Sequence, residues 1–357
     1  MKLIHGGDVV GYREEYGREP LDFSANCNPL GMPPGVKAAA AAALEEAHRY
    51  PDPLCRQLRA AIAQEEGLPP QWILCGNGAA DLIFRLVLAL RPRRALLVAP
   101  AFAEYEQALA TIDCLVVFHD LREEEEFRLT DAILPQITPE TDLLFLCTPN
   151  NPTGWAIPRE LLLRIARRCR ETGTVLALDE CFCSLLDEPE AFTMTGFLEE
   201  FPNLIILKAF TKLYAMAGLR LGYCLCREEG LLEKMAACAQ PWSVSNVAQA
   251  AGIAALQEQA YREQTKTLIH SQREFLRREL TALGVQVIGS QANYLFIRTD
   301  LPCLGQRLKE RGILLRSCAN YRGLDERYYR LAVRLPEENA CLLQEMRGLV
   351  AAGKGTP

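Results

Sequence analysis

Residues 143–180 read LLFLCTPNNPTGWAIPRELLLRIARRCRETGTVLALDE, and this stretch decides the fold. The apolar run Leu143–Cys147 is followed by turn residues, by the stretch Arg159–Thr172 and by a second apolar run, Val175–Leu178. Apolar residues recur every three or four positions in the middle stretch, which is typical of an amphipathic helix, and Gly173 suits its C-cap. Both apolar runs are continuous rather than alternating. We therefore expect strands buried on both faces, as in a parallel sheet covered by helices.

The same pattern continues on both sides of this unit. Similar β-rich runs occur at Ala95–Ala99, Cys114–Phe118, Leu204–Leu207 and Gly222–Cys226. This alternation of strands and helices predicts an α/β domain over residues 46–240.

The two ends of the chain predict a second, smaller α+β domain, in which residues 1–45 join residues 241–357. Helices are expected at Ala38–Leu44, Ser243–Leu283, Cys303–Arg311 and Glu337–Leu349, and strands at Val285–Ile288, Asn293–Arg298 and Arg330–Val333.

Charge and hydropathy exclude several classes of protein. The 357 residues include 39 Lys and Arg against 45 Asp and Glu, a net charge of −6, which argues against broad binding to nucleic acid or to an anionic membrane. A small anion remains possible as a substrate, because a pocket can be locally basic. No apolar span approaches 18 residues and the first ten residues lack a signal-peptide core, so we expect a cytoplasmic protein without a membrane partner.

The 14 cysteines are scattered and form no CxxC pair, and only four histidines are present. Zinc-site spacing is therefore missing, and we expect no metal. Most of the cysteines are expected to be small buried hydrophobic residues in a reducing compartment.

Two charged side chains follow predicted strands. Lys212 comes after the run Leu204–Leu207 among apolar residues, where desolvation lowers the pKa of a lysine and suits it to forming a Schiff base. Arg220, eight residues later, is placed to reach a phosphate-sized anion. Asp179 ends a predicted parallel strand, where α/β sheets bind ligands. Taken singly, each residue has a simpler explanation: a solvated strand end for Lys212 and a helix N-cap for Asp179.

Two turn-rich segments add polar groups. The sequence Thr148–Gly154 follows a strand and contains Asn151, whose amide can face an oxygen-bearing ligand, although a tight strand–helix turn is the simpler explanation. Gly76-Asn77-Gly78 opens a helical run and predicts a phosphate site made of free backbone N–H groups, without the motif of a nucleotide loop. Tyr105 suits stacking on a flat ring, although most such tyrosines only pack.

In this order, these segments resemble the pyridoxal-phosphate-dependent class I/II aminotransferase family. The resemblance implies the aspartate aminotransferase-like fold (fold type I), with a mostly parallel seven-stranded sheet, and pyridoxal 5'-phosphate as cofactor. It implies a Schiff base at Lys212, with Asp179 at the pyridinium nitrogen, Asn151 at the ring hydroxyl and Tyr105 stacked on the ring. The cofactor phosphate is expected at Gly78, Ala79, Thr211 and Arg220. Two positions depart from the family pattern: Phe182 replaces a common tyrosine, and Ala209 replaces a common serine.

A closer resemblance, to the threonine-phosphate decarboxylases of cobalamin biosynthesis, lies in His5-Gly6-Gly7, Asp22–Gly31, Pro241–Val244 and Arg316–Tyr321. It implies conversion of L-threonine O-3-phosphate to (R)-1-amino-2-propanol O-2-phosphate and CO2. The implied substrate-binding residues are His5, Gly7, Asn28, Asn151, Arg316, Arg330 and Arg334. Of these, we expect Arg330 at the carboxylate and His5, Arg316 and Arg334 at the phosphate.

Three alternatives remain open from the sequence. The substrate could be L-serine O-phosphate, which differs by one methyl group, or the enzyme could be a histidinol-phosphate-type aminotransferase. The third alternative is a cofactor-binding protein without catalysis. The family resemblance also implies a homodimer, in which Tyr50 reaches the cofactor phosphate of the neighbouring subunit.

Overall fold

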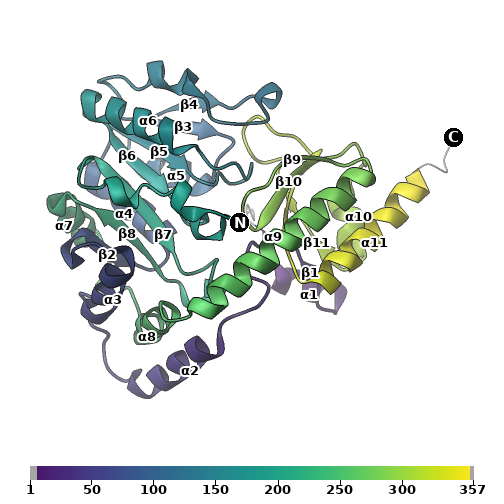
Figure 1. Ribbon diagram of the computed structural model, residues 1–357, viewed down its shortest axis with the longest axis horizontal. Helices are drawn as coiled ribbons and strands as arrows, with labels where there is room; N and C mark the ends of the chain where they lie inside the picture. The colour runs from purple at the N-terminus through teal and green to yellow at the C-terminus, as the bar shows by residue number, and fades with distance from the viewer. Residues whose placement is uncertain (1–5, 354–357) are drawn as a thin grey trace.

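The computed structural model describes residues 6–353, and a seven-stranded sheet forms its larger part (Figure 1). The strand order is β2-β8-β7-β6-β5-β3-β4. The strands are β2 (Ile73–Gly76), β3 (Arg94–Ala99), β4 (Leu115–Asp120), β5 (Leu143–Cys147), β6 (Val175–Asp179), β7 (Leu204–Ala209) and β8 (Gly222–Cys226). Only β8 runs antiparallel to its neighbours, so the predicted mostly parallel sheet is confirmed.

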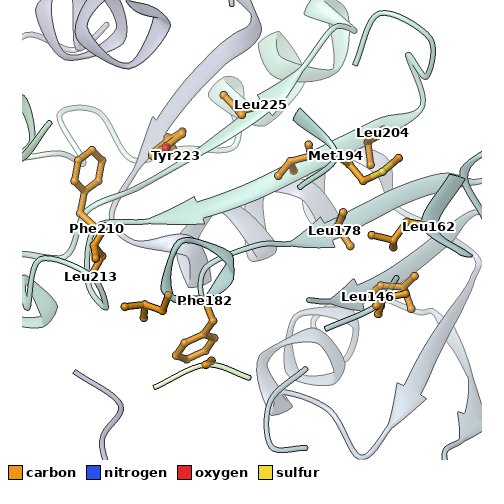
Figure 2. Packing of buried hydrophobic residues seen from close by; sticks show 14 of the residues in the cluster. Leu146, Leu162, Leu178, Phe182, Met194, Leu204, Phe210, Leu213, Tyr223 and Leu225 are labelled. Atoms are coloured by element: carbon orange, nitrogen blue, oxygen red, sulfur yellow. The ribbon is translucent and has the colours of Figure 1, made fainter. Parts of the chain in front are cut away.

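Helices cover both faces of this sheet, which explains why its strands are continuously apolar. On one face lie α3 (Arg56–Glu66) and α6 (Arg159–Thr172), and on the other lie α4 (Ala79–Leu90), α5 (Ala103–Leu109) and α7 (Glu229–Ala237). Figure 2 shows the first of these layers, where Leu162 of α6 packs near Leu146 and Leu178 of the sheet. Each such fully buried leucine contributes roughly 1.5–3 kcal/mol to stability.

The smaller part combines both ends of the chain. Strand β1 (Leu21–Asp22) pairs with β11 (Ile313–Leu314), beside a four-stranded antiparallel sheet in the order β12-β13-β10-β9. Those four strands are β9 (Gln286–Gly289), β10 (Tyr294–Arg298), β12 (Arg316–Ser317) and β13 (Tyr328–Ala332), and the accompanying helices are α1 (Val9–Tyr16), α10 (Leu304–Glu310) and α11 (Pro336–Gly353). The precise domain boundaries, at residues 46 and 240, stay a prediction.

The long helix expected over Ser243–Leu283 is wrong, because two helices occupy this stretch. Helix α8 (Asn246–Ala255) begins at Ser245, whose hydroxyl accepts a hydrogen bond from the N–H of Ala248. The backbone leaves the helical region at Glu258 before α9 (Gln259–Ala282) begins. Helix α9 then runs obliquely from the region of α8 to the smaller sheet (Figure 1). Helix α2 (Pro34–Ala43) packs on α8. Among residues 6–353, no helix combines the length and the apolar character needed to cross a membrane.

Candidate active site

A cavity of about 230 Å³ lies at the carboxyl ends of the central parallel strands. Cys147 ends β5, Asp179 ends β6 and Lys212 follows β7 by three residues, and all three line this cavity. Arg316 and Arg330 of the smaller sheet close it from the other side. The site is therefore built where a parallel sheet leaves room for a ligand, with a second wall supplied by the other end of the chain.

Lys212 has the environment of a nucleophilic amine. It is half-buried in the cavity wall, with its Nζ 5.4 Å from the centroid of the Phe182 ring. Burial lowers the pKa of Lys212, and the positive charges of Arg330 and Arg220 add to this effect. The neutral amine needed to attack an aldehyde is thus more populated than in an exposed lysine.

Asp179 is held by two hydrogen-bond donors. Its Oδ2 accepts a hydrogen bond of 2.7 Å from the hydroxyl of Tyr105, and its Oδ1 accepts one of 2.9 Å from the N–H of Cys181. Two such hydrogen bonds fix the orientation of the carboxyl group. An oriented aspartate in the cavity wall is suited to partner a protonated ring nitrogen.

The prediction that Tyr105 stacks on the cofactor ring is wrong. Tyr105 is buried behind the wall, its ring parallel to that of Phe145 at 4.8 Å. Phe102, three residues earlier, lines the cavity instead. The two aromatic residues flank the start of α5, and only the tertiary packing on Phe145 decides which of them faces the ligand.

A cradle for a phosphate group lies at the start of α4. Gly78 precedes this helix with φ +83, and a Cβ there would lie 2.7 Å from Nη2 of Arg220. The positive φ favours glycine here, and the absence of a Cβ lets the Arg220 guanidinium approach the backbone. Ala79, Thr211 and Arg220 line the cavity beside it. The free N–H groups of the helix start and one guanidinium fit a bound phosphate, as predicted from the sequence.

Asn151 and Arg330 contact each other in the cavity wall. Nη1 of Arg330 donates to Oδ1 of Asn151 at 2.6 Å, and its Nη2 donates to the carbonyl oxygen of Ser24 at 2.8 Å. The guanidinium of Arg316 lies 5.0 Å from the centroid of the Tyr321 ring, and both residues line the cavity. Arg316 and Arg330 therefore bring two further cationic groups to the same space as Arg220.

Two residues absent from the sequence prediction also line the cavity. Asn26 is 1% exposed, and neither atom of its side-chain amide has a hydrogen-bond partner within residues 6–353. An unsatisfied buried amide that faces a cavity indicates a polar ligand. In the sequence, the only feature that pointed to Asn26 was its position two residues before Asn28. Glu104 is the second: burial raises its pKa to about 7, and the nearby charge of Asp179 adds to the shift.

The structure contradicts two of the predicted substrate contacts. Asn28 is buried outside the cavity, where its amide donates to the carbonyl oxygen of Leu213 and to the hydroxyl of Thr265, both at 2.7 Å. Its side chain thus supports the loop after Lys212. Arg334 points toward α11 and pairs with Glu338 at 2.6 Å.

The remaining predicted contacts are placed as follows. His5 lies outside the described residues. The N–H of Gly7 donates to the hydroxyl of Ser24, and Gly6 rather than Gly7 lines the cavity. Tyr50 is 77% exposed and is not among the residues that line the cavity, and its ring stacks on Trp242 at 4.2 Å.

A partly desolvated lysine, an anchored aspartate and a phosphate cradle at the carboxyl edge of this sheet define a pyridoxal-phosphate-dependent enzyme. The family model described as "Aminotransferase class I and II" matches residues 18–342, and the chain belongs to this family. Pyridoxal 5'-phosphate is accordingly its cofactor, and the cavity described above fits that group.

Individual relatives agree with this assignment. The chain is 42% identical to the threonine-phosphate decarboxylase of Salmonella typhimurium, over 97% of this chain and 96% of the relative. It is 32% identical to a histidinol-phosphate aminotransferase of Cupriavidus pinatubonensis, over 95% and 92% of the two chains. A solved structure of Thermus thermophilus aspartate aminotransferase superposes with a TM-score of 0.83 at 25% identity, covering 98% of this chain and 97% of that one. The aspartate aminotransferase-like fold is thereby confirmed.

Proposed function

We propose that the protein decarboxylates L-threonine O-3-phosphate to (R)-1-amino-2-propanol O-2-phosphate and CO2, a reaction of cobalamin biosynthesis. The observation that carries this proposal is the number of cationic groups in one cavity. Arg220 at the helix start suffices for the cofactor phosphate, which leaves Arg316 and Arg330 for the substrate. Two guanidinium groups suit a substrate with two anionic groups, here a carboxylate and a phosphate. The relative with 42% identity supports the same assignment.

The bound cofactor supplies an electron sink for the charge left at the α carbon. Asp179, anchored by Tyr105, holds the proton on the ring nitrogen that this sink requires. Arg330 binds the carboxylate of the substrate and Arg316 binds its phosphate. Together the two arginines orient the α carbon and so select the bond that breaks. Orientation of this kind contributes roughly 7–11 kcal/mol to catalysis. Lys212, or a water molecule, returns a proton to the α carbon.

The test is a reaction of the purified holoenzyme with L-threonine O-3-phosphate in the absence of any 2-oxo acid. We expect continuous release of CO2 and formation of the amino-propanol phosphate. Formation of a 2-oxo acid and pyridoxamine phosphate, without CO2, would show transamination and overturn the proposal.

Aminotransfer to or from histidinol phosphate is the second candidate, because a relative with 32% identity carries that name. The discriminating measurement uses histidinol phosphate with the same holoenzyme. Conversion of the cofactor to its amine form in a single turnover favours this candidate. L-serine O-phosphate belongs in the same series, since one methyl group is worth only about 1–3 kcal/mol of discrimination.

We also propose that the protein acts as a homodimer. Tyr50, Leu54 and Trp242 expose 77%, 52% and 45% of their surface, which is unusual for large apolar side chains and suits burial by a second copy. The sedimentation velocity of the wild type and of a Tyr50→Ala/Trp242→Ala variant tests this assembly. A monomeric wild type would contradict it.

A further inference from the structure

Next to the phosphate cradle, outside the cavity lining, lies an ion pair between a buried arginine and a half-buried aspartate. Asp81 is the third residue of α4, and Arg85 follows it by one helical turn. Nε of Arg85 donates to Oδ1 of Asp81 at 2.9 Å, and its Nη2 contacts Oδ2 of the same carboxylate. The side chain of Arg85 is only 4% exposed, against 28% for Asp81. The contact is bidentate, the geometry that fixes a carboxylate most firmly.

This pair is connected to the loop that forms the cradle. Oδ2 of Asp81 also accepts a hydrogen bond of 2.7 Å from the N–H of Asn77, between the two glycines of the loop. On its other side, Nη2 of Arg85 donates to the hydroxyl of Ser243 at 2.8 Å. Ser243 follows Trp242, which stacks on Tyr50. One hydrogen-bond network thereby connects the loop, the first turn of α4 and the segment 242–243.

The charge of Asp81 needs this partner. A bound phosphate is dianionic, and it would lie at Ala79 and Ala80, next to Asp81 in the first turn of α4. An unpaired carboxylate at that position would repel the phosphate, whereas one neutralised by Arg85 does not. The same carboxylate then serves the cradle, because it orients the loop through Asn77.

We propose that Asp81 and Arg85 are positioning residues for the cofactor phosphate. Arg85 neutralises Asp81 and aims it at the N–H of Asn77, and this arrangement sets the affinity of the apoprotein for the phosphate group of the cofactor. The proposal depends on the cofactor alone, so it stands whether the enzyme proves to be a decarboxylase or an aminotransferase.

The test compares two aldehydes that differ only in the phosphate, pyridoxal 5'-phosphate and pyridoxal. Their dissociation constants are measured on the apoprotein by quenching of tryptophan fluorescence. For Arg85→Met we expect the constant for pyridoxal 5'-phosphate to rise at least tenfold, while that for pyridoxal stays within twofold. A loss of affinity that is equal for both aldehydes, or no loss, would overturn the proposal.

A second variant separates charge from packing. Asp81→Asn in the Arg85→Met background removes the unpaired carboxylate, so we expect affinity for pyridoxal 5'-phosphate to return to within about threefold of the wild type. If the double variant binds as weakly as Arg85→Met, neutralisation is not the role of Arg85.

The matched control is Arg334→Met. It breaks another pair four residues apart on the chain, Arg334 with Glu338, outside the cavity, and it should leave both constants unchanged. Should Arg85→Met fail to fold, Arg85→Lys keeps the charge but loses the bidentate contact. It is expected to weaken binding of pyridoxal 5'-phosphate at least threefold and that of pyridoxal not at all, and an equal change in both would again overturn the proposal.

Discussion

The hydroxyl of Tyr105 donates a hydrogen bond of 2.7 Å to Oδ2 of Asp179, and both residues are buried. Tyr105 is thus a neighbour of the acid that faces the cofactor nitrogen, although its ring never reaches the cavity. The bond connects the packing of α5 on Phe145 to the orientation of Asp179.

Tyr105→Phe keeps the packing of the ring and removes only this donor. A hydrogen bond to a charged group is worth about 1.5–3 kcal/mol, so we expect kcat/KM to fall roughly ten- to a hundredfold. Tyr12→Phe is the control, because Tyr12 is equally buried but its hydroxyl contacts Arg18, outside the cavity. Equal activity of the two variants would show that the bond to Asp179 is dispensable.

Lys212 and Lys208 are both half-buried, and their pKa values move in opposite directions. Burial by itself lowers both, but the charges of Glu66 and Glu180 outweigh it at Lys208 and raise the pKa of that residue. Of the two, Lys212 is therefore the one whose neutral amine is more populated than in an ordinary lysine. Borohydride reduction of the holoenzyme, followed by peptide mass spectrometry, should find the pyridoxyl group on Lys212 and none on Lys208. Labelling of Lys208, or retention of turnover in Lys212→Ala, would contradict this assignment.

We expect Glu104 to make substrate binding dependent on pH. Its pKa of about 7 means that the carboxyl group is neutral below this pH and negative above it. Asp179, Lys212 and Arg316 are the charged groups whose fields act on it. Because the ionised form repels an anionic substrate, we expect KM to rise as pH passes from about 6 to 8.

Glu104→Gln is always neutral, and its KM should stay flat over this range. A variant whose KM follows the pH as strongly as that of the wild type would assign the dependence to another group, such as the substrate phosphate itself.

Arg316→Met tests whether Arg316 binds the substrate while Arg220 binds the cofactor phosphate. A charge-assisted contact to a phosphate is worth about 1.5–3 kcal/mol, so KM for L-threonine O-3-phosphate should rise roughly ten- to a hundredfold. Affinity for pyridoxal 5'-phosphate should change little, since Arg220 and the start of α4 hold that group. If Arg316→Met instead weakened binding of pyridoxal 5'-phosphate and left KM unchanged, Arg316 would contact the cofactor and not the substrate, which contradicts the proposal.

Much of this architecture follows from the sequence alone. Continuous apolar runs can be buried only between two helical layers, so the runs from Ala95 to Cys226 determined a mostly parallel sheet. The residues that follow its strands, Asp179 and Lys212, necessarily meet at one edge, because parallel strands share their carboxyl ends. Gly78 was recognisable as well, since a glycine before an apolar helix indicates close approach of a ligand or a side chain.

Only the tertiary structure decided between side chains that local pattern cannot tell apart. Phe102 and Tyr105 are two aromatic residues at the start of one helix. Tyr105 packs on Phe145 behind the cavity wall, whereas Phe102 lines the cavity. Asn26 and Asn28 lie in one turn-rich segment, while Arg330 lies in the middle of β13 and Arg334 lies two residues beyond its end. In each pair, one residue lines the cavity and the other bonds to protein. The direction of a side chain in a turn or near the end of a strand depends on residues distant in sequence. It therefore cannot be predicted from the periodicity of one helix or strand.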